Sequence, residues 1–310
     1  MSRGDEDAYG WFARQESDSN RLKSIESYML SVSPAEADIW FKVGVQRVTA
    51  RTEVRGRIVG PRCLFAETVE VVSPLRSVRH KEKEEVALIA RTAIPEPCFW
   101  DPHNPLLYRV VVELWQDGQR CSVSGFDLGF RMIEMDSGNV FVKRKPVFLQ
   151  GMPYLPQSQE EAAARRRAGY NLVLAEKGQW HWWVRANPMG FLLLEKAALS
   201  TLTPQYIGLL CQQPCFFGFV LDKELLDHPP SETESLLRAW QERRVLIGLE
   251  LDGPPPPSLP NGLSFLVCPE SVLPALSTAS LPKLALRDSE AGREKPQARE
   301  VQGVLGWIDQ

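Results

Sequence analysis

Eight short apolar runs fill the second half of the chain, and within each run apolar and polar residues do not alternate. Such runs are typical of parallel strands buried on both faces, and the helical or Pro-rich stretches between them suit the crossovers that parallel strands need. Eight such repeats are what a (β/α)8 barrel requires. The runs span residues 147–151, 171–176, 190–196, 216–224, 244–252, 263–270, 283–290 and 303–309.

The predicted barrel is small, because about 165 residues must supply what such a barrel normally builds from at least 200. Two helices are predicted, over residues 158–169 and 231–244, and Ser231 with Glu234 three places on is suited to capping the second. Residues 252–262 contain consecutive prolines and are predicted to be an extended loop, since proline fixes φ and lacks an amide donor. Loops are therefore expected in place of some helices.

The first half of the chain shows a different pattern, in which short runs rich in Val, Ile and Phe partly alternate with polar residues. Turn-forming pairs such as Gly60-Pro61 and Asp117-Gly118 separate these runs. About seven strands over about 100 residues are typical of an immunoglobulin-like β-sandwich. The fold class predicted for the whole chain is therefore multidomain β and α/β. The predicted domains are an N-terminal arm over 1–35 with a short amphipathic helix at 21–30, an immunoglobulin-like β-sandwich over 36–136 and a degenerate TIM-barrel-like domain over 137–310.

The charge balance argues against a polyanionic partner. Lys and Arg total 36 against 39 for Asp and Glu, a formal net charge of -3, so we expect no nucleic acid and no membrane among the partners. An acidic and polar N-terminus without a long apolar run predicts a cytoplasmic protein. The six cysteines are widely spaced, and the Cys211 and Cys215 pair has no second pair beside it, so we expect no metal and no cofactor. The oligomeric state stays open.

A compound pattern of aromatic, proline and basic residues joins the two predicted domains. Trp100, Pro102, Pro105, Leu107 and Tyr108 precede one strand, Gly129, Phe130 and Arg131 follow the next, and Lys145 and Pro146 open the barrel. In this order and spacing they resemble glycoside hydrolase family 2, the family of β-galactosidase and β-glucuronidase, in which W-x-P-x-x-P-x-L-Y and G-F-R close an immunoglobulin-like domain and N-G-K-P opens the catalytic barrel. The resemblance runs from about residue 36 to 310. Trp100 and Tyr108 are expected in the sandwich core.

The resemblance implies a retaining glycosidase with two glutamates, an acid/base after barrel strand four and a nucleophile near the end of strand seven. Glu224 matches the acid/base, but Lys223 stands where the family has asparagine. A lysine there would lower the pKa of the glutamate, whereas a general acid needs a raised pKa; Asp222 is an alternative partner for the lysine. Glu224 is therefore compatible with a catalytic carboxylate or with a salt-bridged residue at a strand end.

The nucleophile position is less well matched, because Arg287 or Asp288 stands where the family has glutamate. Asp288 is the only chemically suitable substitute, and its side chain is one methylene shorter. Other polar residues of the family are also replaced: its R-G-V-N-R-H segment corresponds to residues 150–155, and its strand-two arginine to Leu174. Losses from several strands favour an emptied site over a changed specificity.

Aromatic residues supply the candidate sugar contacts. Trp307 and Asp309 match the last-strand segment of the family, and Trp180 and Trp182 lie in a tryptophan-rich segment after strand two. Aromatic faces suit sugar rings, although adjacent tryptophans also cap small cores or form partner interfaces. These four residues are the predicted substrate-binding set.

Together these residues predict a family 2-like protein that is catalytically impaired or inactive and acts as a carbohydrate- or protein-binding module. The alternative is a weak or divergent retaining β-glycosidase that uses Glu224 as acid/base and Asp288 as nucleophile, since fold alone does not decide activity. A third hypothesis is an adhesive or assembly role for the sandwich, which predicts an exposed apolar patch.

Overall fold

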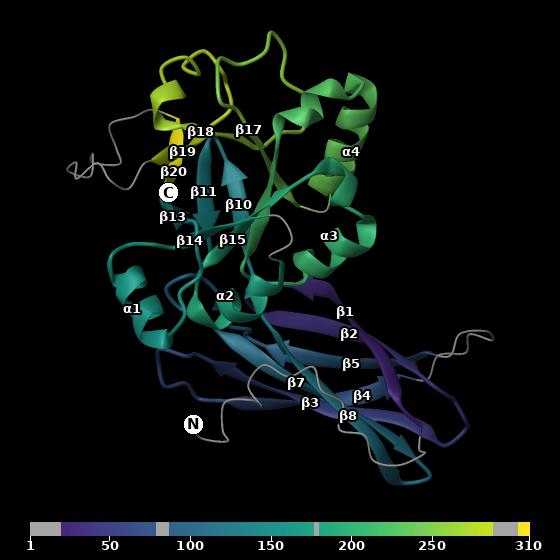
Figure 1. Cartoon of the computed structure of the whole chain (residues 1–310). Coiled ribbons are helices and arrows are strands. Elements are labelled where there is room, and N and C mark those ends of the chain that lie inside the picture. Colours follow the sequence, from purple (N-terminus) through teal and green to yellow (C-terminus); the bar gives the residue numbers. More distant parts are fainter. Residues whose placement is uncertain (1–19, 79–86, 177–179, 243, 288–302) are drawn as a thin grey trace. The chain divides into compact units, whose positions relative to one another are not determined.

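The computed structural model describes residues 20–78, 87–176, 180–242, 244–287 and 303–310. The chain divides into two compact units: Met1–Trp100 with Leu106–Phe130, and Asp101–Pro105 with Arg131–Gln310. Each unit has its own strands, arranged in separate sheets (Figure 1). Each also has its own buried apolar residues.

The first unit is a curled, sandwich-like, seven-stranded antiparallel sheet in the order β1-β2-β5-β4-β3-β7-β8. β4 turns the corner of the curl, because its first half pairs with β3 and its last residues pair with β5. The alternation along β2 buries every second side chain, from Ala37 to Val45. The predicted β-sandwich class is confirmed. The strands are β1 (Leu22–Val32), β2 (Glu36–Val45), β3 (Thr52–Arg62), β4 (Val71–Val78), β5 (Ala87–Pro95), β7 (Leu107–Gln116) and β8 (Gln119–Leu128).

The helix predicted at 21–30 is wrong, because residues 22–30 belong to strand β1. β1 pairs antiparallel with β2 along most of its length, from Leu22 opposite Val45 to Val32 opposite Ala37. A helix-like local pattern is weaker than the backbone hydrogen bonds that a neighbouring strand offers.

The aromatic residues of the family-like motif lie in the core of the first unit. Trp100 and Phe130 are fully buried in the short paired strands β6 (Phe99–Trp100) and β9 (Phe130–Arg131). The Tyr108 ring contacts Phe130 at 5.2 Å between ring centres, and its hydroxyl accepts the Cys98 amide at 2.8 Å. Burial raises the pKa of Tyr108 to about 12. The motif therefore acts as packing, as predicted for Trp100 and Tyr108.

The second unit is a closed barrel of eight parallel strands, which confirms the eight predicted runs. A small three-stranded antiparallel sheet, β10 (Ile133–Asp136), β11 (Asn139–Val142) and β12 (Lys145–Val147), precedes it. The barrel strands are β13 (Leu149–Met152), β14 (Leu172–Ala175), β15 (Leu192–Ala197), β16 (Phe216–Leu221), β17 (Leu246–Glu250), β18 (Phe265–Pro269), β19 (Lys283–Arg287) and β20 (Val304–Asp309).

Some of the described connections between barrel strands contain no α-helix, as predicted. Ser158 caps α1 by accepting the Glu161 amide, whereas α4 begins at Pro230, so Ser231 lies inside that helix and is not its cap. The proline stretch after β17 forms no helix. The α-helices are α1 (Gln159–Arg167), α2 (Trp183–Met189), α3 (Pro204–Cys211) and α4 (Pro230–Glu242), and the 3-10 helices are η2 (Trp180–Trp182), η3 (Leu199–Thr201), η4 (Lys223–Asp227) and η5 (Glu270–Val272).

Close packing between neighbouring strands needs glycine at several barrel positions, of which Gly151 and Gly248 are two. A Cβ at Gly151 would lie 2.8 Å from the Ile308 side chain, and one at Gly248 would overlap the Phe265 ring. The large side chains of Ile308 and Phe265 therefore fill the space that glycine leaves. In barrels of this kind, functional residues lie at the carboxyl ends of the strands.

Candidate functional site at the carboxyl ends of the barrel strands

A lysine lies between two carboxylates at the barrel mouth. Lys196, near the end of β15, places Nζ 3.2 Å from Glu250 Oε1 at the end of β17 and 3.7 Å from Glu176 Oε1 just after β14. The Lys196 side chain is 25% exposed and that of Glu250 30%, so water reaches both only in part. Because β16 separates β15 from β17, the Lys196 contact with Glu250 spans two strand spacings. The mouth therefore holds a partly buried cation with two anionic partners.

A second ion pair lies at the end of β19, where the resemblance predicts the nucleophile position. Arg287 Nε donates to Glu270 Oε2 at 3.2 Å, and the guanidinium carbon lies 4.1 Å from the centre of the Trp307 ring. A guanidinium keeps its proton and is not a nucleophile. The alternative nucleophile, Asp288, lies outside the described residues.

The predicted acid/base lies on η4, directly after β16. Asp222 caps this turn, because its Oδ1 accepts the Glu224 amide at 3.1 Å. Lys223 turns to Asp252 and not to Asp222 or Glu224, with Nζ 3.0 Å from Asp252 Oδ2. The hydrogen bond between these two side chains lowers the pKa of Asp252 and raises the pKa of Lys223. Lys223, which stands where the family has asparagine, is therefore paired with Asp252, just after the neighbouring strand β17.

The predicted sugar-binding residues have other partners or lie partly outside the description. Trp307 is 7% exposed, beneath Arg287, and Asp309 Oδ2 accepts the Tyr170 hydroxyl at 2.5 Å. Trp182 is half-buried in η2, and the side chain of Trp180 lies outside the described part of the chain. In the described ranges no hydrogen bond or ion pair joins Glu224 to Trp182, Trp307 or Asp309.

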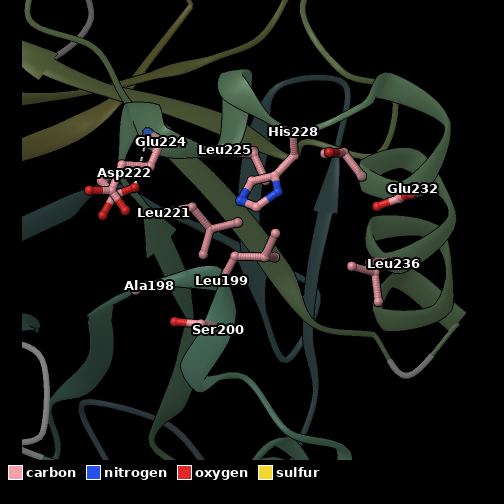
Figure 2. Close-up of a pocket in the computed structure, with 11 residues that line it drawn as sticks. Ala198, Leu199, Ser200, Leu221, Asp222, Glu224, Leu225, His228, Glu232 and Leu236 are labelled. Carbon is pink, nitrogen blue, oxygen red and sulfur yellow. Dashed lines mark hydrogen bonds between the residues drawn. The ribbon is translucent and has the colours of Figure 1, made fainter.

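A pocket of about 350 Å³ lies beside Glu224 (Figure 2). Its wall comes from η3, from the end of β16 with η4, and from the first two turns of α4. Asp222, Glu224 and Glu232 supply carboxylates, and His228 supplies an imidazole.

Among the described residues, no group of three or more His, Cys, Asp or Glu side chains is arranged to hold a metal ion. No described helix is long and apolar enough to cross a membrane.

Several of these residues were not predicted from the sequence. Lys196 ends one of the apolar runs and Glu250 lies near the end of another, so the rule that barrel sites gather at carboxyl strand ends could have identified them. His228, Glu232 and the buried Thr233 come from a turn and a helix start, and their spacing carries no recognisable motif.

The first unit matches a family model, Glycosyl hydrolases family 2, over residues 25–131. The β-galactosidase of Alteromonas mediterranea is 23% identical over 194 residues, which cover 55% of this chain and 19% of that protein. The β-galactosidase of Pseudoalteromonas haloplanktis is 38% identical over 146 residues, covering 42% of this chain and 14% of that protein. The chain therefore spans less than a fifth of these relatives' length.

Solved structures show the same fold over nearly the whole chain. A calcium-binding mutant of Bacteroides uniformis β-glucuronidase 2 aligns with a TM-score of 0.62 at 14% identity, covering 94% of this chain and 47% of that one. Bifidobacterium dentium β-glucuronidase, complexed with coumarin-3-O-glucuronide, aligns at 0.59 and 12% identity, covering 94% and 60%. The family model over residues 25–131, the β-galactosidase relatives and the shared fold show that the chain is similar to glycosyl hydrolase family 2 proteins, from which it diverges in sequence.

Proposed function

We propose that the protein is catalytically impaired and binds carbohydrate at the barrel mouth without cleaving it. The observation that carries this proposal is the Arg287 ion pair with Glu270 at the end of β19. A retaining mechanism needs two carboxyl groups about 5 to 5.5 Å apart, one of which attacks the sugar from a strand end. A guanidinium held at this strand end provides no attacking group and favours an ionised neighbour.

The barrel mouth suits binding better than bond cleavage. An ammonium donates hydrogen bonds and a carboxylate accepts them, so the cluster of Lys196, Glu176 and Glu250 matches sugar hydroxyls, which do both. Charge-assisted hydrogen bonds of this kind are stronger than neutral ones. The cluster therefore supports recognition, while the close cation disfavours the protonated carboxyl that a general acid requires.

The test combines hydrolysis and binding on the purified protein. We expect no release of aryl alcohol from a panel of aryl β-glycosides, for the natural chain or for Glu224→Gln. On a sugar array, Lys196→Met is expected to weaken the bound signal about tenfold, because a charged donor is lost. Lys223→Met is the matched control, since it removes an exposed ion pair on the same edge of the barrel, and it should bind as the natural chain does.

Hydrolysis that disappears in Glu224→Gln would overturn the proposal and favour the weak retaining β-glycosidase, with Asp288 the next residue to change. Equal sugar binding by Lys196→Met and the natural chain would remove the barrel mouth as the site. A chain that binds no sugar would favour a protein partner instead. In that case the exposed Val69, Val71 and Val72, at 86%, 55% and 58%, are the first surface to test.

A further inference from the structure

One row of large side chains crosses four neighbouring strands of the first unit. Strands β1, β2, β5 and β4 lie side by side in this order (Figure 1). Residues that pair directly across strands point to the same side of a sheet, and Ile39 and Phe41, on either side of the row along β2, are fully buried on the other side. The row therefore lies on the outer face. In strand order, its directly paired members are Tyr28, Trp40, Arg91 and Arg76.

This outer row is accessible and has the composition of a binding surface. Tyr28 is 46% exposed, the Arg91 side chain is 50% exposed, and Arg76 is also exposed. Tryptophan, tyrosine and arginine are the residue types that most often dominate the binding energy of protein interfaces. A row made only of these three types indicates a surface that contacts another protein.

The outer row has an aromatic half and a cationic half. The aromatic half comes from β1 and β2, and the cationic half from β5 and β4. The Arg91 guanidinium carbon already lies 5.5 Å from the centre of the Trp40 ring, so the two halves are chemically suited to stack. A two-fold axis parallel to the strands, between β2 and β5, would place each aromatic side chain of one copy opposite an arginine of the other. The row is therefore self-complementary.

The two edges of this face carry opposite charges without ion pairs. On β1, Glu26 accepts the Tyr28 hydroxyl at 2.5 Å but has no cationic partner in the described ranges. On β4, Arg76 has no ion pair with any described residue, and it lies directly opposite Arg91, a like charge that destabilises an antiparallel pair. Asp38 neutralises only Arg91, through hydrogen bonds of 2.8 and 3.0 Å. The same two-fold axis would bring Glu26 of one copy beside the partner's Arg76.

We propose that two copies of the chain associate through this outer face, related by that two-fold axis. A second copy satisfies both edges at once, whereas an acidic partner of another kind would pair with Arg76 and leave Glu26 without a cation. The interface goes beyond the carbohydrate site proposed at the barrel mouth, because it lies on the first unit and uses none of the barrel residues. Four strands form a narrow surface, so we expect a weak dimer with a dissociation constant in roughly the micromolar range.

Sedimentation equilibrium of the full chain, at concentrations from about 1 to about 200 µM, measures this association. We expect a monomer at the low end, a dimer at the high end, and weaker association as salt rises. A monomer at every concentration would overturn the proposal.

Charge reversals test which residues meet. Glu26→Arg and Arg76→Glu should each weaken dimerisation at least about tenfold, because each places like charges together twice in a symmetric dimer. An equimolar mixture of the two variants should recover a dimer, since opposite charges then face each other at both contacts. The chain that carries both changes should recover it for the same reason.

Arg238→Glu, the same charge change at an exposed position of α4 in the barrel unit, is the matched control and should dimerise as the natural chain does. Circular dichroism of each variant establishes that the fold is kept. A dimer that neither reversal weakens would place the interface elsewhere. Folded variants that fail to recover a dimer when mixed would contradict the pairing of Glu26 with the partner's Arg76.

Discussion

At the scale of single residues, the hairpin turn between β11 and β12 is unusual. Val142 pairs with Lys145, so only Lys143 and Arg144 form the turn, and their φ values are +54° and +61°. Two-residue turns with both φ values positive favour Asn-Gly, because other side chains are strained there. Lys143 has a compensating contact, since its Nζ donates to Asp101 Oδ2 at 2.9 Å. No contact of the exposed Arg144 offers a similar compensation in the described residues.

Arg144→Gly should therefore raise the free energy of unfolding by about 0.5 to 1 kcal/mol, because glycine adopts positive φ without strain. Urea unfolding monitored by circular dichroism measures this change. Arg51→Gly is the control, since Arg51 is a similarly exposed arginine whose φ is not positive, and it should give no stabilisation. A destabilised Arg144→Gly would show that the arginine side chain supports the turn.

Individual site residues could be predicted only where the adjacent sequence fixes their place in the fold. Glu224 follows a buried strand, so its place near a strand end could be read from the sequence. The partner of Lys223 could not, because Asp252 is 29 residues away and meets it only when β16 and β17 pair. The same holds for Lys196 with Glu250, which are 54 residues apart. Side-chain pairing across strands depends on barrel closure, which residue spacing does not encode.

At the scale of elements, β19 begins with a buried charge. Lys283 is 8% exposed, and its Nζ donates to the Ala279 carbonyl at 2.6 Å. Burial lowers the pKa of its ammonium below the usual value. Between the lowered folded pKa and the normal unfolded pKa, the unfolded chain holds more protons than the folded chain. Stability from this group therefore rises as pH rises through that window.

Lys283→Met should remove this pH dependence. At pH 7 the variant should be more stable than the natural chain by on the order of 1 kcal/mol, because the cost of burying the charge disappears. The advantage should shrink as the pH rises through the window between the lowered folded pKa and the ordinary unfolded pKa, where the natural lysine loses its proton on folding. Urea unfolding of both chains at pH 7, 8.5 and 10 measures the difference. An advantage that stays constant across these pH values would contradict the role of the charge.

The elements themselves were largely predictable. The eight barrel strands could be identified because strands covered on both faces leave continuous apolar runs, such as Leu172–Ala175 and Phe216–Leu221, in which every residue is buried. β1 could not, because it has one buried residue in eleven and depends on β2 for its hydrogen bonds. A strand whose stability comes from its neighbour leaves little signal in its own sequence.

At the scale of the whole molecule, the chain supplies the second unit from two separate places. Asp101–Pro105 belongs to the barrel unit, although the residues on both sides of it belong to the first unit. Arg166 of α1 holds this loop: its Nη2 donates to the carbonyls of Pro102 and His103 at 2.7 and 2.6 Å. The loop's own amides are organised by Asp101, whose Oδ1 accepts from His103 and Asn104 at 2.8 Å each.

Arg166→Met should loosen the 101–105 loop, because the variant keeps the aliphatic stem but loses the guanidinium that bonds two carbonyl groups. Hydrogen exchange of the full chain, followed by mass spectrometry on peptides that contain His103 and Asn104, should become at least about fivefold faster, a loss of roughly 1 kcal/mol in local opening. Arg167→Met changes the adjacent, exposed arginine and should leave this exchange unaltered. If both variants exchange like the natural chain, Asp101 and Lys143 hold the loop without Arg166. A loop that opens only in Arg166→Met would show that a contact formed across 64 residues makes this segment part of the barrel.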